Sequence, residues 1–91
     1  MEPLTPRTYH IEIEAPAWKV LMNFEEKLRE KIFDKIYTLE LNPRPSGCKK
    51  LKDKGGLYRV RIGDYRVIYS IQDDKLIVII VEVFDRKEGY D

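Results

Sequence analysis

The 91-residue sequence has only one cysteine, Cys48, and only one histidine, His10. A single cysteine excludes an internal disulfide and every metal site built from several thiolates. One histidine with one distant cysteine also cannot supply the set of ligands that a zinc ion requires. We therefore expect no metal, and structural roles for both residues.

Long hydrophobic runs are missing as well. The longest, residues 76–81 followed by Val83 and Phe84, is far shorter than the roughly 20 residues of a bilayer-spanning helix. Residues 1–6 have neither the basic head nor the apolar stretch of a signal peptide, so we expect a cytoplasmic protein without a membrane partner. A chain of this length forms one domain, residues 1–91, whose thin core leaves little room for a deep cofactor pocket. No cofactor is expected.

Charge is abundant and unevenly distributed. Residues 1–43 hold six basic and eight acidic side chains, and residues 67–91 hold three basic and six acidic ones. Residues 44–66, the basic segment, hold eight basic and only two acidic side chains. A basic segment within an otherwise acidic chain indicates a local site for a polyanion. Its lysines, Lys49, Lys50, Lys52 and Lys54, are candidate contacts for a polyanion such as RNA, although for the lysines alone the glycines beside them favour a solvated loop.

Periodicity predicts an α+β fold in the order β-α-α-β-β-β. Alternating apolar residues indicate a strand over 9–13, and Pro16 suits the first turn of a short helix. Asn23 and Glu26 resemble a capping box that opens a second helix, which ends near Leu41. Residues 42–56 read as a polar loop with a short extended piece around Leu51.

The second half of the chain is rich in β-branched and aromatic residues. Residues 57–62 and 65–71 are predicted to form a tight hairpin around Gly63-Asp64, and residues 76–84 a central strand covered on both faces. Hairpin connections favour a mainly antiparallel sheet, with the two N-terminal helices packed on one face.

Arginines gather in this hairpin. Arg59 and Arg61 are two residues apart and share one face of a strand, and Arg66 follows on the partner strand. Like charges in such proximity repel, which favours a site for an anion, although pairing with nearby carboxylates is an equally plain explanation. We expect Arg61 and Arg66 at an exposed site rather than in the core. Arg86 and Tyr90 then follow the last strand, where they could reach the same face.

Together these residues resemble the RelE branch of the RelE/ParE toxin superfamily. The similarity covers Leu51 to Tyr69, the apolar strand and the terminal Arg86, Lys87 and Tyr90, with the other elements in the family's order. It implies a RelE-like fold and a toxin of a type II toxin–antitoxin system that cleaves mRNA in the ribosomal A site by metal-independent attack of the 2′-OH. The implied partners are the ribosome with its mRNA and a cognate RelB-like antitoxin.

The resemblance also implies the catalytic residues: Arg59, Arg61, Arg66, Arg86 and Tyr90. Arg66 matches the arginine that stabilises the phosphate, Arg86 the arginine linked to protonation of the leaving group, and Tyr90 the terminal tyrosine. Arg59 and Arg61 occupy positions where well-known members carry lysines. Because arginine effectively never loses its proton, more of the proton transfer then falls to Tyr90.

Two alternatives remain open from the sequence. The first keeps the fold and changes the target, as a ParE-like gyrase inhibitor or a catalytically silent relative that binds an antitoxin. Arg86 and Tyr90 disfavour the gyrase inhibitor, since that branch usually lacks this pair. The second is a non-catalytic RNA-binding module that uses residues 44–66 and their tyrosines as a stacking platform.

Overall fold

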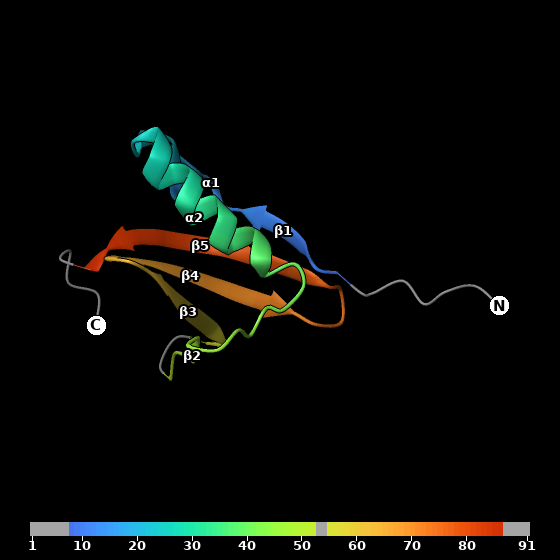
Figure 1. Ribbon diagram of the computed structural model, residues 1–91. Helices are drawn as coiled ribbons and strands as arrows, with labels where there is room; N and C mark the ends of the chain where they lie inside the picture. The colour runs from blue at the N-terminus through green and yellow to red at the C-terminus, as the bar shows by residue number, and fades with distance from the viewer. Residues whose placement is uncertain (1–7, 53–54, 87–91) are drawn as a thin grey trace.

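The computed structural model describes residues 8–52 and 55–86. Its elements are β1 (His10–Ile13), α1 (Ala15–Asn23), α2 (Glu26–Thr38), β2 (Lys49–Lys50), β3 (Leu57–Ile62), β4 (Tyr65–Gln72) and β5 (Ile77–Asp85). The strands form one sheet in the order β1-β5-β4-β3-β2, and the two helices lie together on one side of it (Figure 1). The predicted α+β class and the placement of both helices are confirmed.

The sheet is antiparallel between β2, β3, β4 and β5, whereas β1 runs parallel to β5. Parallel neighbours need a long connection, and here α1, α2 and the strands β2, β3 and β4 all lie between β1 and β5 in the sequence. Strand β2 lies close to the extended piece expected around Leu51, and it pairs only with Tyr58 and Arg59 of β3. The outer edge of β3 is therefore not covered by β2 beyond Arg59.

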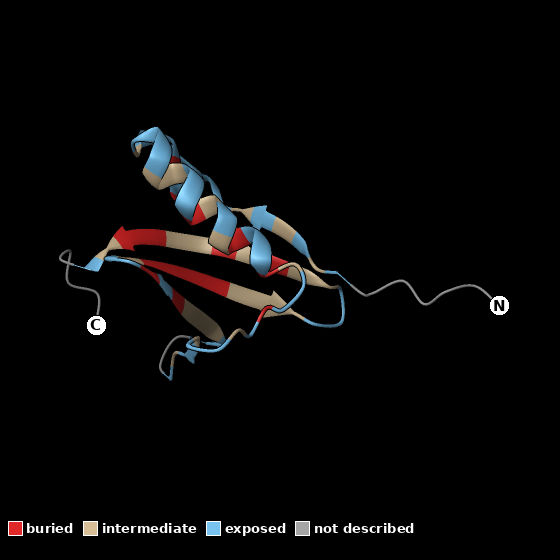
Figure 2. Ribbon diagram, in the orientation of Figure 1, coloured by how far each residue is buried: buried red, intermediate tan, exposed pale blue. Residues whose placement is uncertain are grey.

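The core lies between the helices and the sheet. Alternate residues of β3 and β4, including Val60 and Val67, pack against Leu21 of α1 and Ile32 and Ile36 of α2. Figure 2 shows this as buried stretches on the strands and on the inward side of the helices, with exposed residues on the outward side. Because side chains alternate across a strand, the residues between these core positions face away from the helices.

The connection between the helices differs from the sequence prediction. Asn23 is the last residue of α1 rather than the N-cap of α2, and α2 begins at Glu26, with Glu25 as an N-cap that makes no side-chain capping hydrogen bond. Arg29 instead donates hydrogen bonds to the carbonyls of Met22 and Phe24 in this connection. The predicted capping box was wrong because the first helix continues through the residue that was expected to start the second.

The helices are short. Neither one, within the residues that the structure describes, has the length and apolar character needed to cross a membrane.

Candidate functional site

Two pairs of cations face each other directly across the strands that carry the basic segment. Arg61 of β3 lies opposite Arg66 of β4, and Lys49 of β2 lies opposite Arg59 of β3. Directly opposed residues project to the same face of a sheet, so these four side chains share the face that points away from the helices. The register thus confirms that Arg59, Arg61 and Arg66 lie on one face of the sheet.

The three arginines differ in their exposure. Arg61 is exposed and Arg59 is half-buried, whereas Arg66 is only 6% exposed. The sequence led us to expect Arg66 at an exposed site, and that expectation was wrong. Strand β4 is the middle strand of the sheet, so the side chains of β3 and β5 flank Arg66 on both sides.

Arg86 directly follows β5 at the same end of the sheet. Its backbone N–H donates a hydrogen bond of 2.7 Å to the carbonyl of Asp64 in the β3–β4 turn. This places the backbone of Arg86 beside the turn that joins Arg61 to Arg66. Tyr90 and Lys54, two further predicted site residues, lie outside the described residues.

A pocket of about 350 Å³ opens next to the arginines. It is lined by Lys35, Ser46, Gly47, Lys49, Arg59, Val60 and Arg61. The pocket lies at the edge of β3 that β2 leaves uncovered, between α2 and the residues that lead into β2. Four of the lining residues are cations and none is a carboxylate, so the pocket suits an anion.

The predicted RNA-binding lysines do not all lie at the pocket. Lys49, Lys50 and Lys52 are all exposed, and among them Lys49 alone lines the pocket. Lys50 lies opposite Tyr58 and therefore faces the other side of the sheet from Lys49. Lys35 joins the pocket from α2, and sequence reasoning missed it because a lysine on the polar side of a helix looks like an ordinary solvated residue.

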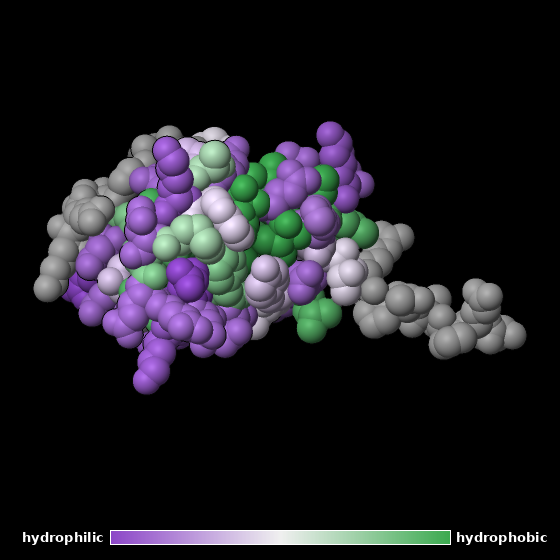
Figure 3. Space-filling view, turned by 90° about the horizontal axis from the view of Figure 1, so that it is seen from above, coloured by the Kyte–Doolittle hydropathy of each residue, from purple (hydrophilic) through white to green (hydrophobic). Residues whose placement is uncertain are grey.

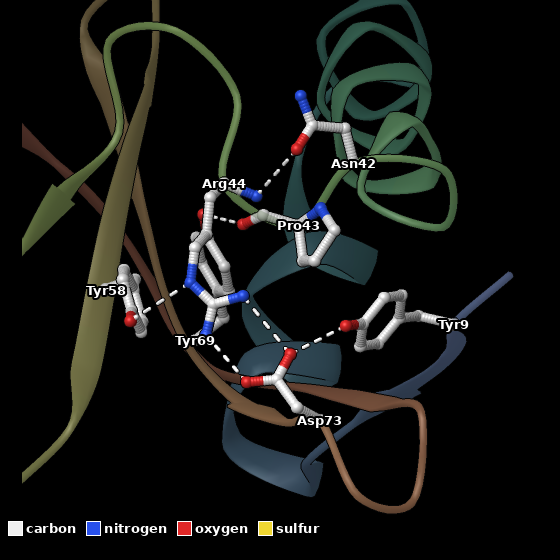
Figure 4. A network of polar contacts seen from close by, with 7 residues as sticks. All are labelled: Tyr9, Asn42, Pro43, Arg44, Tyr58, Tyr69 and Asp73. Carbon is white, nitrogen blue, oxygen red and sulfur yellow. Dashed lines mark hydrogen bonds and ion pairs between the residues drawn. The ribbon is translucent and has the colours of Figure 1, made fainter. Parts of the chain in front are cut away.

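One arginine of the basic segment has a structural role that the sequence did not reveal. Arg44 forms a two-pronged ion pair with Asp73, at 3.1 Å from Nη1 to Oδ1 and 2.8 Å from Nη2 to Oδ2. Its Nε donates to the Tyr58 hydroxyl at 3.2 Å, and the Tyr9 hydroxyl donates to Asp73 at 2.6 Å. These residues, Tyr9, Arg44, Tyr58 and Asp73, are called the Arg44 clamp (Figure 4).

The clamp fixes the chain that leads from α2 to the pocket. Beside it, the buried Tyr69 hydroxyl donates a 2.7 Å hydrogen bond to the carbonyl of Pro43, and the Tyr69 ring stacks on Tyr58 (Figure 4). Burial raises the pKa of the Tyr69 phenol, with a smaller contribution from the neighbouring Cys48 thiol. Pro43 and Arg44 are thus attached to the sheet just before Ser46 and Gly47 line the pocket.

The lowered pKa of Asp73 predicts that the fold loses stability in acid. Hydrogen bonds from Arg44 and Tyr9 lower the pKa of Asp73 to about 2, from an ordinary value of 3.8. The clamp therefore contributes its stability above about pH 4 and loses it as the pH falls from about 4 to about 2. In urea unfolding at several pH values, Asp73→Asn should be less stable than the wild type at pH 6, with the difference disappearing near pH 2. A difference that is constant over this range would contradict the assignment.

The part of the chain that the structure describes contains no group of three His, Cys, Asp or Glu side chains that could hold a metal ion.

Comparisons with known proteins agree with this architecture. Residues 15–90 match the model of the family described as ParE toxin of type II toxin-antitoxin system, parDE. RelE1 of Methanocaldococcus jannaschii is 34% identical over 85 residues, covering 90% of this chain and 94% of that protein. The toxin RelE of Mycobacterium tuberculosis is 34% identical over 83 residues, covering 90% of this chain and 86% of that protein. The crystal structure of the archaeal RelE–RelB complex from Pyrococcus horikoshii aligns with a TM-score of 0.78 at 30% identity, covering 90% of this chain and 99% of that chain.

Proposed function

Because the chain belongs to the RelE/ParE toxin superfamily, we propose that it is the toxin of a type II toxin–antitoxin pair and that it cleaves mRNA in the ribosomal A site. The proposal places the protein in the cytoplasm, where ribosomes and mRNA are found. Its partners are the ribosome with mRNA, and a RelB-like antitoxin that holds the toxin inactive.

The observation that carries the proposal is the two pairs of directly opposed cations in the sheet. Arg61 opposite Arg66, and Lys49 opposite Arg59, each place like charges where cross-strand neighbours repel. A surface selected for stability alone would alternate these charges with carboxylates. A phosphate bound beside these cations would offset the repulsion, which supports a site for an RNA backbone on this face.

The chemistry of RNA cleavage suits these residues. The 2′-oxygen loses its proton and attacks the adjacent phosphorus, the bond to the 5′-oxygen breaks, and the departing 5′-oxygen takes up a proton. Negative charge builds on the phosphorus oxygens meanwhile, and the guanidiniums of Arg61 and Arg66 stabilise that charge. Tyr90 is proposed to take part in the proton transfer and Arg86 to assist the leaving group, without a metal ion.

A ribosome-programmed cleavage assay tests the function. Purified toxin added to ribosomes that hold an mRNA should produce cuts in the A-site codon, and mRNA without ribosomes serves as the control. Inhibited DNA supercoiling with intact mRNA would overturn the proposal in favour of a gyrase inhibitor. RNA binding without any cut would instead favour an RNA-binding module.

The outer side of the helix pair is a candidate antitoxin surface. The Trp18 and Phe33 rings contact edge to face at 6.0 Å, and the Phe33 and Tyr37 rings stack at 5.9 Å. Trp18 is 47% exposed and Tyr37 49% exposed, and Met22 is exposed as well. Figure 3 views the molecule from above, the side on which the helices lie, and shows that green and pale atoms are exposed there among purple ones. The contiguous row of Trp18, Phe33 and Tyr37 is an exposed apolar patch, which is typical of a protein contact.

Truncating the aromatic row should weaken antitoxin binding. Aromatic residues at the centre of an interface each contribute about 2 kcal/mol or more, so Trp18→Ala and Tyr37→Ala should each lower the affinity for the cognate antitoxin by roughly 30-fold. Isothermal titration of the purified pair measures the effect, with the exposed α1 residue Lys19→Ala as control. Affinities equal to the wild type in both aromatic variants would exclude this side as the antitoxin surface.

A further inference from the structure

One residue that lines the pocket beside the opposed cations, Lys35, lies outside the basic segment. Lys35 lies in the second half of α2 and is half-buried, whereas Lys27 and Lys31 of the same helix are exposed. Lys35 lines the pocket together with Lys49, Arg59 and Arg61. Cations from one helix and two strands thus surround the same 350 Å³ space.

Lys35 and Lys49 are available to an incoming anion. Neither forms an ion pair within 4 Å of a carboxylate belonging to the residues 8–52 and 55–86. The lining also includes the Ser46 hydroxyl and Gly47, whose φ of +92° is a conformation that glycine adopts without strain. A Cβ added at Gly47 would meet no atom within 4 Å, so the backbone conformation and not the available space favours glycine here.

Arg61 belongs both to this pocket and to the pair it forms with Arg66. A phosphate between Arg61 and Arg66 would therefore have the pocket directly beside it, along the edge of β3. The next anionic group of the same strand is a neighbouring backbone phosphate, since every nucleotide of RNA carries one. The pocket offers that group ammonium donors from two sides.

We propose that this pocket is a second phosphate subsite, in which Lys35 and Lys49 bind the RNA phosphate next to the scissile one. The inference rests on the proposed function for the identity of the ligand as RNA. The lysines act as point charges that fix the position of the strand, while the reacting phosphate is held by the arginines.

Titration with inorganic phosphate tests the pocket without any need for catalysis. In amide NMR spectra, phosphate should shift the signals of Gly47 and Arg61 in the wild type. Lys35→Gln and Lys49→Gln should each weaken this binding by roughly 3- to 10-fold, in line with the loss of one charge-assisted hydrogen bond at a partly exposed site. Lys35→Arg should stay close to the wild type, and so should Lys27→Gln, which removes a lysine from the same helix away from the pocket. Lys35→Gln and Lys27→Gln with equal affinity would overturn the subsite.

Cleavage kinetics then test the role toward RNA. Lys35→Gln should raise KM for programmed ribosomes by roughly 3- to 10-fold with a smaller change in kcat, because the contact is made in the ground state and the transition state alike. An unchanged KM alongside weakened phosphate binding would overturn the assignment to substrate RNA. A wild-type protein that cuts no mRNA would refute the proposed function, while the phosphate titration would still decide whether the pocket binds an anion.

Discussion

Arg61→Gln is expected to reduce ribosome-dependent mRNA cleavage by about 10- to 1000-fold, the usual cost of losing one preorganised donor to the transition state. The same change should raise the free energy of unfolding by about a few tenths of a kcal/mol at low salt, because it removes one of two like charges that face each other across β3 and β4. Opposite effects on activity and stability distinguish a functional cation from a structural one. Single-turnover cleavage and urea unfolding measure the two quantities.

Arg66 is tested with two substitutions, to Gln and to Lys, because its side chain is buried and the loss of its charge also changes the packing. Arg66→Gln should reduce cleavage by a similar factor, and Arg66→Lys keeps the charge and shows how much of the loss is due to the forked guanidinium geometry. The double Gln variant should abolish growth arrest. Arg29→Gln is the matched control, since Arg29 contacts carbonyls between α1 and α2 and lies outside the pocket lining. Full cleavage by both single Gln variants would refute the assignment of these arginines.

Tyr69→Phe is expected to lower the free energy of unfolding by about 1–3 kcal/mol. The phenylalanine keeps the ring that stacks on Tyr58 and loses the hydroxyl that donates to Pro43, which leaves a buried carbonyl without that donor. Reversible urea denaturation at neutral pH measures the change. Because Pro43 precedes the pocket residues Ser46 and Gly47, the variant should also weaken the binding of phosphate to the pocket.

Tyr58→Phe provides the control for this effect. Its hydroxyl accepts one hydrogen bond from Arg44 at an exposed site, so its removal should cost under about 1 kcal/mol. If the two variants lose the same stability, the buried hydrogen bond to Pro43 is not what attaches this part of the chain to the sheet.

Local periodicity in the sequence determined most of the elements and the face on which each side chain lies. Arg59 and Arg61 share a face because strand side chains alternate, and the Gly63-Asp64 turn pairs their strand with β4 in a register that brings Arg66 opposite Arg61. These relations span few residues, so the arginine cluster could be predicted without a structure. The two helices on one face of the sheet likewise followed from the order of the elements.

The tertiary structure alone decided which distant residues meet. Asp73 lies 29 positions from Arg44 and 64 from Tyr9, and no periodic pattern records partners at such separations. The parallel place of β1 beside β5, the burial of Arg66 on the middle strand and the entry of Lys35 into the pocket all depend on how the strands are ordered and where α2 crosses them. The position of a residue in the periodic pattern of a helix or strand predicts the face on which its side chain lies. Its neighbours across the fold are set by the packing of the whole chain.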